Sequence, residues 1–193
     1  MTRGAERYSS HEGAATIQRF TPEARIRLKE AGYVLIPLTE QSIKTARDKG
    51  RVFSQTWHKK EPELEALRSR FSQVAVNPDR LFLRGSGAKS FEDQERMVQE
   101  FSKRLGIDGV EAVIGTMPDY VDLAFSYLEM TGELLFGGEN RYEYTRTRTM
   151  ADPYRLIDIG NHHPTEGLSI DRFGPKLISG PIHVACILVP TAK

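Results

Sequence analysis

The clearest chemical motif in this chain is a glycine-rich loop, Arg-Gly-Ser-Gly-Ala-Lys-Ser, over residues 84–90. An apolar run precedes the loop and a patterned helix follows it, which is the order in which many proteins bind phosphate through backbone amides. In that interpretation the amides at Gly85 and Gly87 bind the anion, and Arg84 and Lys89 supply positive charge. The loop therefore predicts a phosphate or nucleotide site.

A structural role explains the same loop. The P-loop pattern Gly-x-x-x-x-Gly-Lys-Ser/Thr requires glycines where this chain has Leu83 and Ala88. Ser90 is a typical helix N-cap, with Asp93 at the capping-box position. Glu92 and Asp93 also place negative charge in the first turn, where it would repel a phosphate. We therefore favour a helix cap and keep anion binding as an alternative.

Histidines and acids near the C-terminus form a second candidate site. His162 and His163 are adjacent, and Glu166 follows three residues later. Imidazole and carboxylate groups bind zinc, iron or manganese, and three such ligands leave a position for water. Adjacent residues on a strand point to opposite faces, which disfavours a site that uses both histidines. The alternative function is thus a metal-dependent enzyme, with a divalent metal as cofactor and these residues as ligands or as acid and base.

A third candidate is the alternating segment Tyr-Glu-Tyr-Thr-Arg-Thr-Arg-Thr at residues 142–149. On a strand, Tyr142, Tyr144, Arg146 and Arg148 share one face. Two guanidinium groups beside two phenol rings can bind a carboxylate or a phosphate. An ordinary amphipathic sheet also explains the pattern, if the arginines pair with acids on neighbouring strands.

The elements that must position these residues follow from caps and periodicity. The best-supported helix begins after Ser90 and ends at Gly106, with an apolar stripe, acids early and basic residues late. A second begins at Thr116 and ends near Gly132. Further helices are predicted at residues 21–31, 39–50 and 61–70, and strands at 33–38, 74–76, 110–114, 142–149, 154–160, 168–171 and 182–189. The fold class is α+β, a single domain with helices and short strands in the N-terminal two thirds and an antiparallel sheet in the C-terminal third.

The composition fits one globular domain. The chain has 193 residues, of which 39% are hydrophobic and 27% charged. Residues 1–20 lack apolar periodicity and predict a flexible or loosely docked tail before a domain of residues 21–193. No apolar stretch approaches the roughly 18 residues of a membrane span, and the first residues lack a secretory signal, so we expect a cytoplasmic protein. The single cysteine, Cys186, excludes an internal disulfide.

The charges are unevenly distributed along the chain. Residues 1–105 carry 20 Lys and Arg against 14 Asp and Glu, whereas the remainder carries 7 against 12. We interpret this as two halves that attract each other on folding, because a nucleic-acid domain has a denser basic patch. We therefore expect a binding or interaction protein with the Tyr and Arg strand face as contact surface. Its partner is a protein or a small anionic ligand, and neither nucleic acid nor a membrane is expected.

Overall fold

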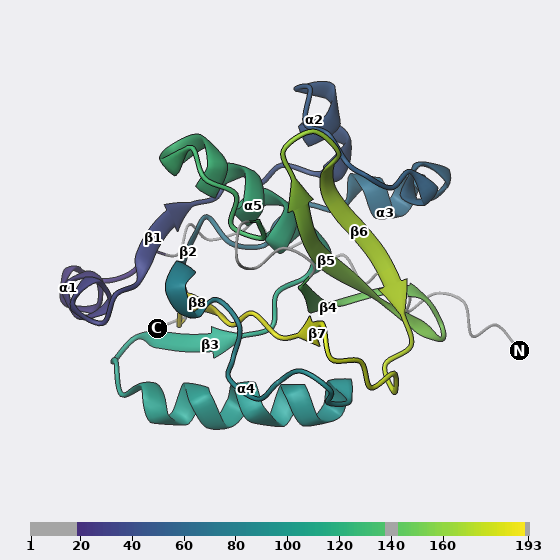
Figure 1. Cartoon of the computed structure of the whole chain (residues 1–193). Coiled ribbons are helices and arrows are strands. Elements are labelled where there is room, and N and C mark those ends of the chain that lie inside the picture. Colours follow the sequence, from purple (N-terminus) through teal and green to yellow (C-terminus); the bar gives the residue numbers. More distant parts are fainter. Residues whose placement is uncertain (1–18, 138–142, 192–193) are drawn as a thin grey trace, which may run out of the picture.

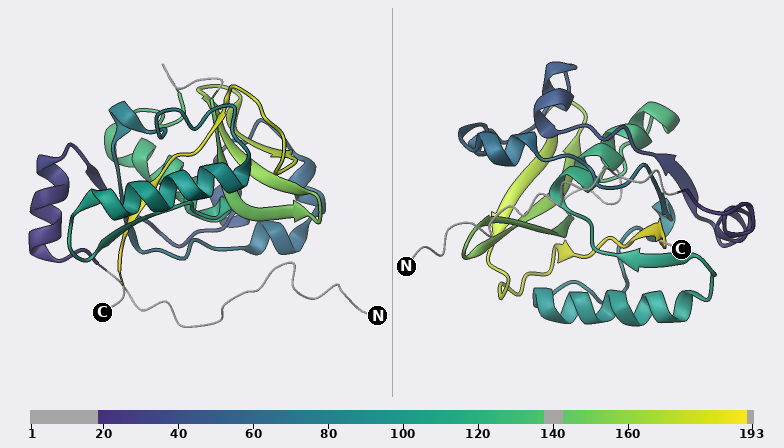
Figure 2. Two further views of the ribbon diagram at one scale, coloured as in Figure 1. Left: turned by 90° about the horizontal axis from the view of Figure 1, so that it is seen from below. Right: turned by 180° about the vertical axis from the view of Figure 1, so that it is seen from behind.

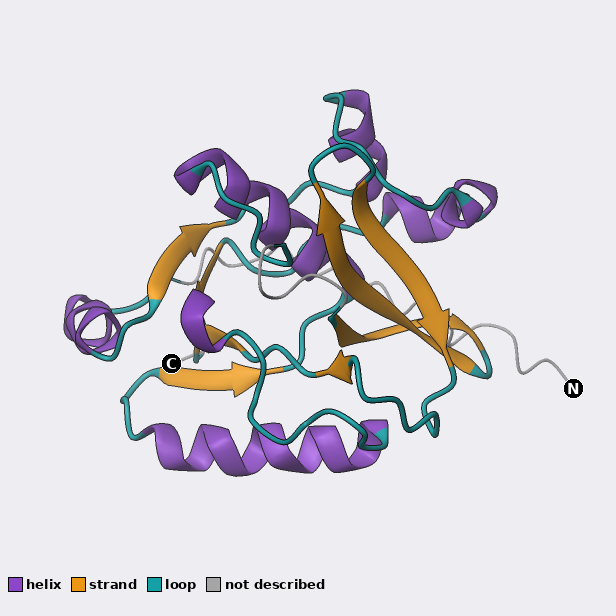
Figure 3. Ribbon diagram, in the orientation of Figure 1, coloured by secondary structure: helices purple, strands orange, loops and turns teal. Residues whose placement is uncertain are grey.

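The computed structural model describes residues 19–137 and 143–191. These residues form five α-helices, two short 3-10 helices and eight strands in two sheets (Figures 1 and 3). In chain order they are α1 (Pro22–Glu30), β1 (Val34–Pro37), α2 (Ile43–Asp48), η1 (Trp57–Lys60), α3 (Pro62–Ala66), β2 (Gln73–Val76), η2 (Pro78–Arg80), α4 (Phe91–Leu105), β3 (Val110–Val113), α5 (Met117–Thr131), β4 (Tyr144–Asp152), β5 (Arg155–His163), β6 (Gly167–Phe173), β7 (Ile182–His183) and β8 (Ile187–Pro190). The predicted α+β class in one domain is confirmed. Within the described residues, every helix is too short or too polar to cross a membrane.

The first sheet joins distant parts of the chain in the order β1-β2-β8-β3. All its pairs are antiparallel, and β8 lies between β2 and β3. Leu188 of β8 accordingly pairs with Ala75 on one side and with Ala112 on the other. The insertion of β8 leaves β3 at the edge of this sheet.

The second sheet has the order β6-β5-β4-β7. The strands β4, β5 and β6 form the predicted antiparallel sheet, and β7 pairs with β4 in parallel. The single strand predicted at residues 182–189 is divided in the structure, because β7 belongs to this sheet and β8 to the first. Between them the chain bonds to other segments: the Ala185 amide donates to Thr145 Oγ1 at 2.8 Å, and the Val184 carbonyl accepts from the Leu83 amide at 2.9 Å.

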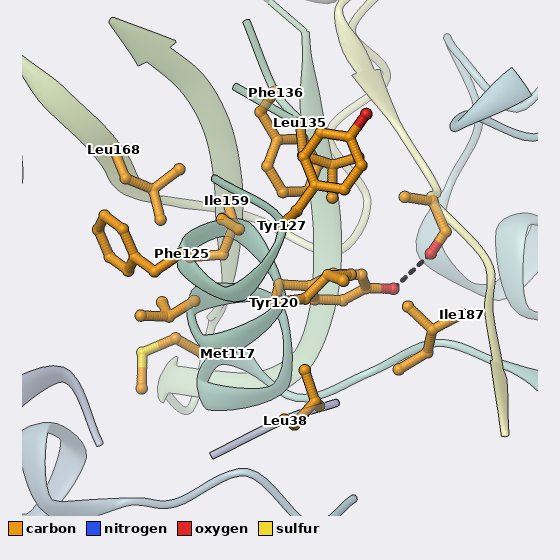
Figure 4. Packing of buried hydrophobic residues seen from close by; sticks show 14 of the residues in the cluster. Leu38, Met117, Tyr120, Phe125, Tyr127, Leu135, Phe136, Ile159, Leu168 and Ile187 are labelled. Carbon is orange, nitrogen blue, oxygen red and sulfur yellow. Dashed lines mark hydrogen bonds between the residues drawn. The ribbon is translucent and has the colours of Figure 1, made fainter. Parts of the chain in front are cut away.

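The helix α5 fills the space between the sheets. All its residues from Met117 to Tyr127 are buried, and its side chains pack with core residues of both sheets, such as Ile159 and Ile187 (Figure 4). A helix that is buried on all sides must satisfy its polar groups internally. Asp122 does so by accepting bonds from the amide and hydroxyl of Thr39, at 2.9 and 2.8 Å.

A smaller apolar cluster lies on the other face of the first sheet, where α1 and α4 cover it. It contains Leu28 of α1, Val98 of α4 and Ala112 of β3. Phe20, which was predicted to belong to the tail, is 4% exposed and packs in the same cluster. Seen from below in Figure 2, α4 lies on the outside of the molecule.

The predicted ends of α4 and α5 are confirmed, whereas the helix predicted at residues 61–70 ends at Ala66 as α3. Ser90 caps α4 by accepting the Asp93 amide at 3.2 Å, and Gly106 ends that helix with a φ of 63°. The predicted cap at Thr39 is wrong: α2 begins after Ser42, whose hydroxyl accepts the Thr45 amide. Thr39 instead bonds to α5, a long-range contact that local pattern does not reveal.

Candidate binding groove

A groove of about 640 Å³ runs beside β3. One wall is α4, the floor is residues 111–114, and the far side carries Arg70, Phe71 and Arg148. Three segments far apart in the sequence therefore meet around it. Figure 2 shows α4 and β3, which bound the groove, side by side in the view from behind.

The α4 wall follows from helical periodicity. Glu95, Gln99, Ser102 and Lys103 line the groove together with Val98, and their spacing of three or four residues places them on one side of a helix. Val98 is buried, whereas Gln99 and Lys103 are exposed. The wall thus offers an apolar base and a polar rim.

Arg70 is held at the groove by the start of α5. The Arg70 amide donates to Asp119 Oδ1 at 2.8 Å, and its Nη2 lies 3.3 Å from Asp119 Oδ2. The guanidinium also lies 5.1 Å from the centre of the Phe71 ring, a cation–π contact. Because Asp119 is fully buried, it fixes both the backbone and the side chain of Arg70.

Arg148 closes the end of the groove near Ile114. Its amide donates to the Gly115 carbonyl at 2.9 Å, which ties β4 to the end of β3. Its guanidinium pairs with Glu95 on α4 at 2.9 Å. Among the described residues that line the groove, three are basic, Arg70, Lys103 and Arg148, and two are acidic, Glu95 and Glu111.

The predicted Tyr and Arg face does not form one exposed surface. Arg146 is 1% exposed, whereas Arg148 is exposed and reaches the groove. Tyr144 is half-buried, with its ring 6.5 Å from that of Phe173. Tyr142 lies outside the described residues. The pairing of β4 with β5 shifts between Arg146 and Met150, so regular alternation does not extend along the strand.

Arg146 has a structural role that the exposed-face prediction missed. Its guanidinium donates to the carbonyls of Lys89 at 3.2 Å and Pro175 at 3.3 Å, and also to that of Leu177. Its Nε lies 3.8 Å from Asp158 Oδ1. Burial raises the pKa of the Asp158 carboxyl to about 8, against the opposing attraction of Arg146.

The loop at residues 84–90 packs against the segment before β7. The Ala88 amide donates to the Ser179 carbonyl at 3.1 Å, and Ser86 Oγ accepts the Val184 amide at 3.1 Å. A Cβ on Gly87 would lie 2.5 Å from His183 Cε1, so this glycine is needed for close approach. Arg84, Gly85 and Lys89 are exposed. These contacts explain Ser86 and Gly87 of the loop by packing and hydrogen bonding, without a bound anion.

The three predicted metal ligands do not come together. His162 is buried against the Phe125 ring, at 5.5 Å between centres, while His163 and Glu166 are exposed. Burial, with a smaller contribution from the charge of Arg51, lowers the pKa of His162 to about 4, so its ring is neutral near pH 7. Among residues 19–137 and 143–191, no three His, Cys, Asp or Glu side chains form a group that could hold a metal ion.

Comparison of the chain with protein-family models, with curated proteins and with solved structures found no match. The groove must therefore be interpreted from its own residues. Sequence reasoning identified Arg148 but missed Arg70, Phe71 and Ser102. A signal for the α4 wall was present, since the polar residues between Glu95 and Lys103 recur at helical spacing. No local pattern linked them to Arg70.

Proposed function

We propose that this protein is a binding protein whose partner polypeptide contacts the groove beside β3 through acidic side chains. The observation that carries the proposal is the meeting of Arg70, Lys103 and Arg148 from separate segments around one recess. These three residues are far apart in the sequence, so the fold brings them together. Their convergence on a groove with apolar residues in its floor is typical of a recognition surface.

The guanidinium groups of Arg70 and Arg148 can still donate hydrogen bonds to a ligand. The Arg70 side chain is 50% exposed and that of Arg148 is 46% exposed, although each already contacts one acid. A guanidinium has five N–H donors, so a single carboxylate does not saturate it. A ligand carboxylate can therefore bind Arg148 beside Glu95, or replace Glu95 as its partner.

The contact surface is thus the groove and not the Tyr and Arg strand face that the sequence predicted, and Arg148 belongs to both. We keep the expectation of a cytoplasmic protein, which rests on the lack of a long apolar stretch and of a secretory signal in the sequence. The buried position of Arg146 supports this change, since a side chain that is 1% exposed is unable to contact a partner.

Selection from a displayed library of random decapeptides tests the proposal. We expect peptides enriched in Asp and Glu, because the groove carries one more basic than acidic side chain and its cations lie at the rim. Their affinity should fall by up to about 30-fold in the double variant Lys103→Gln with Arg148→Gln, since each of the two exposed charge contacts contributes up to about 1 kcal/mol. Fluorescence anisotropy measures the affinity, and added salt should weaken it.

Arg96→Gln is the matched control. Arg96 lies on the same helix and pairs with Asp93, but it does not line the groove. It should leave the affinity within about 2-fold of the wild type. Failure to enrich any peptide, or equal losses in Arg96→Gln and in the double variant, would show that the groove is not the contact surface.

A further inference from the structure

Among residues 19–137 and 143–191, β3 pairs with a strand on one side only, that of β8. The amide of Thr191 donates to the Gly109 carbonyl at 3.0 Å, and β3 then continues antiparallel to β8, with Glu111 opposite Val189. In an antiparallel ladder the bonded residues alternate, so residues 109, 111 and 113 direct their backbone groups toward β8. The backbone groups of Val110, Ala112 and Ile114 consequently point away from β8 and toward the free edge.

The Ala112 amide confirms this direction. It donates to Ser102 Oγ on α4 at 2.9 Å, and not to β8. The edge of β3 therefore opens on the groove, because Ser102 lines it and residues 111–114 form its floor. A strand edge at the base of a groove beside a helix is the arrangement in which extended peptides bind by adding a strand.

Basic side chains lie at both ends of this edge. Lys103 is adjacent to Ser102 and lies toward the start of β3, because α4 leads into β3 through a short turn at Gly106. Arg148 lies at the other end, beside Gly115. About four residues of β-strand, at roughly 3.3 Å each, separate the two ends. Val98, which is buried at the base of the α4 wall, lies between them.

We propose that the partner segment binds as an added strand along the free edge of β3, pairing with Ala112 and Ile114, and that it carries acidic residues on both sides of a short apolar stretch. This inference rests on the proposed function and specifies its mode. The acidic groups meet Lys103 at one end and Arg148 with Arg70 at the other. The apolar stretch packs toward Val98.

The shape of the groove selects a peptide over a second copy of this chain. In a second copy the same edge is recessed between α4 and the segment carrying Arg70 and Phe71. Two recessed edges are unable to approach to the spacing of about 4.8 Å that strand pairing requires. A single extended segment has no such obstacle.

Ser102 occupies the place of the partner's carbonyl in the unbound protein. Its hydroxyl satisfies the Ala112 amide, which an edge strand would otherwise leave to water. A serine side chain releases such a bond by rotation about one torsion. Ser102→Ala should therefore remove a competitor and tighten peptide binding by about 3- to 10-fold, as expected for one hydrogen bond.

A backbone scan of a selected peptide tests the mode of binding. Each amide in turn is replaced by an N-methyl amide, which abolishes one N–H donor. Strand addition predicts losses of about 10-fold or more at every second position, because alternate residues of the peptide face β3. Hydrogen exchange at the Ile114 amide should slow on binding, and Ser102→Ala should bind more tightly.

The outcomes separate this inference from the proposed function. If the peptide still depends on Lys103 and Arg148 but shows no two-residue periodicity, strand addition is wrong and the groove proposal stands. If binding is insensitive to Lys103 and Arg148, both are wrong. If sedimentation shows that the unliganded protein dimerises and that the peptide dissociates the dimer, a second copy occupies the edge, which overturns the choice of a peptide partner.

Discussion

Replacing Arg146 with methionine removes a buried guanidinium that joins separate segments of the chain. The side chain donates to the carbonyls of Lys89, Pro175 and Leu177, and its Nε lies 3.8 Å from Asp158. It thereby attaches the loop before α4 and the loop before β7 to the second sheet. Methionine preserves much of the apolar stem but has no N–H donor.

The expected loss follows from these contacts. A hydrogen bond to a charged group contributes about 1.5–3 kcal/mol, but those to Lys89 and Pro175 are long, at 3.2 and 3.3 Å, which favours the lower end. Below about pH 8 Asp158 is protonated, so the loss at pH 6 comes from the three hydrogen bonds, and we expect about 3–5 kcal/mol in total. For a chain of this length that corresponds to a fall in Tm of about 10 °C. Above about pH 8, losing the partner of the buried Asp158 carboxylate adds to this cost.

The loss should also depend on pH. Burial raises the pKa of Asp158 to about 8. Above that pH the carboxylate is charged in the wild type, and Arg146 is the cation that faces it. Because the attraction of Arg146 lowers the pKa of Asp158, the variant loses this stabilisation of the carboxylate, and Arg146→Met should cost more stability at pH 9 than at pH 6.

Urea unfolding followed by circular dichroism at both pH values measures the effect. Arg148→Met is the matched control, because the Arg148 side chain is 46% exposed and forms a surface ion pair with Glu95. Such a pair contributes at most about 1 kcal/mol. Similar losses in the two variants, or a change of under 1 kcal/mol for Arg146→Met, would refute the assignment of Arg146 as a structural link.

Two further predictions concern the second sheet. The pKa of Asp158 is raised from 3.8 to about 8, so its protonation stabilises the folded protein fully below about pH 4, and this stabilisation is lost as the pH rises through about 8. Asp158→Asn should flatten the decline in unfolding free energy between pH 5 and 9 measured in urea; an unchanged profile would contradict the burial argument. A Cβ on Gly160 would lie 2.1 Å from the Glu143 carbonyl oxygen, so Gly160→Ala must separate β4 from β5 and should cost about 2–4 kcal/mol in thermal unfolding. Gly180→Ala, where a Cβ meets nothing within 4 Å, should cost under about 1 kcal/mol, and equal losses would refute the steric argument.

Local features of the sequence were sufficient for the main helices. Ser90 and Gly106 were predicted as the boundaries of one helix, and α4 occupies the residues between them. The capping residue, the acids of the first turn and the αL glycine all act within a few residues of the helix end, so their effect can be read from neighbouring positions. The same is true of α5, which begins after Thr116 and ends at Gly132.

Local pattern failed where a long-range partner decided the outcome. Alternation placed Arg146 and Arg148 on one face, but the irregular pairing of β4 and the loops that cover Arg146 separate them. Thr39 has the residue type of a helix cap, yet it bonds to Asp122, which is 83 residues away. The hydrogen bond between Thr39 and Asp122 depends on where α5 packs. The sequence pattern around Thr39 or Asp122 does not indicate that position.

The sequence by itself determined that residues 91–105 form an amphipathic helix and that an apolar strand follows it, because both depend on short-range periodicity. Only the tertiary structure decided that this strand lies at a sheet edge beside Arg70 and Arg148. The physical reason is the course of the C-terminal segment, which leaves the second sheet after β7 and inserts β8 between β2 and β3. That pairing satisfies one side of β3, and no strand of the described part of the chain pairs with the other side, which faces the groove.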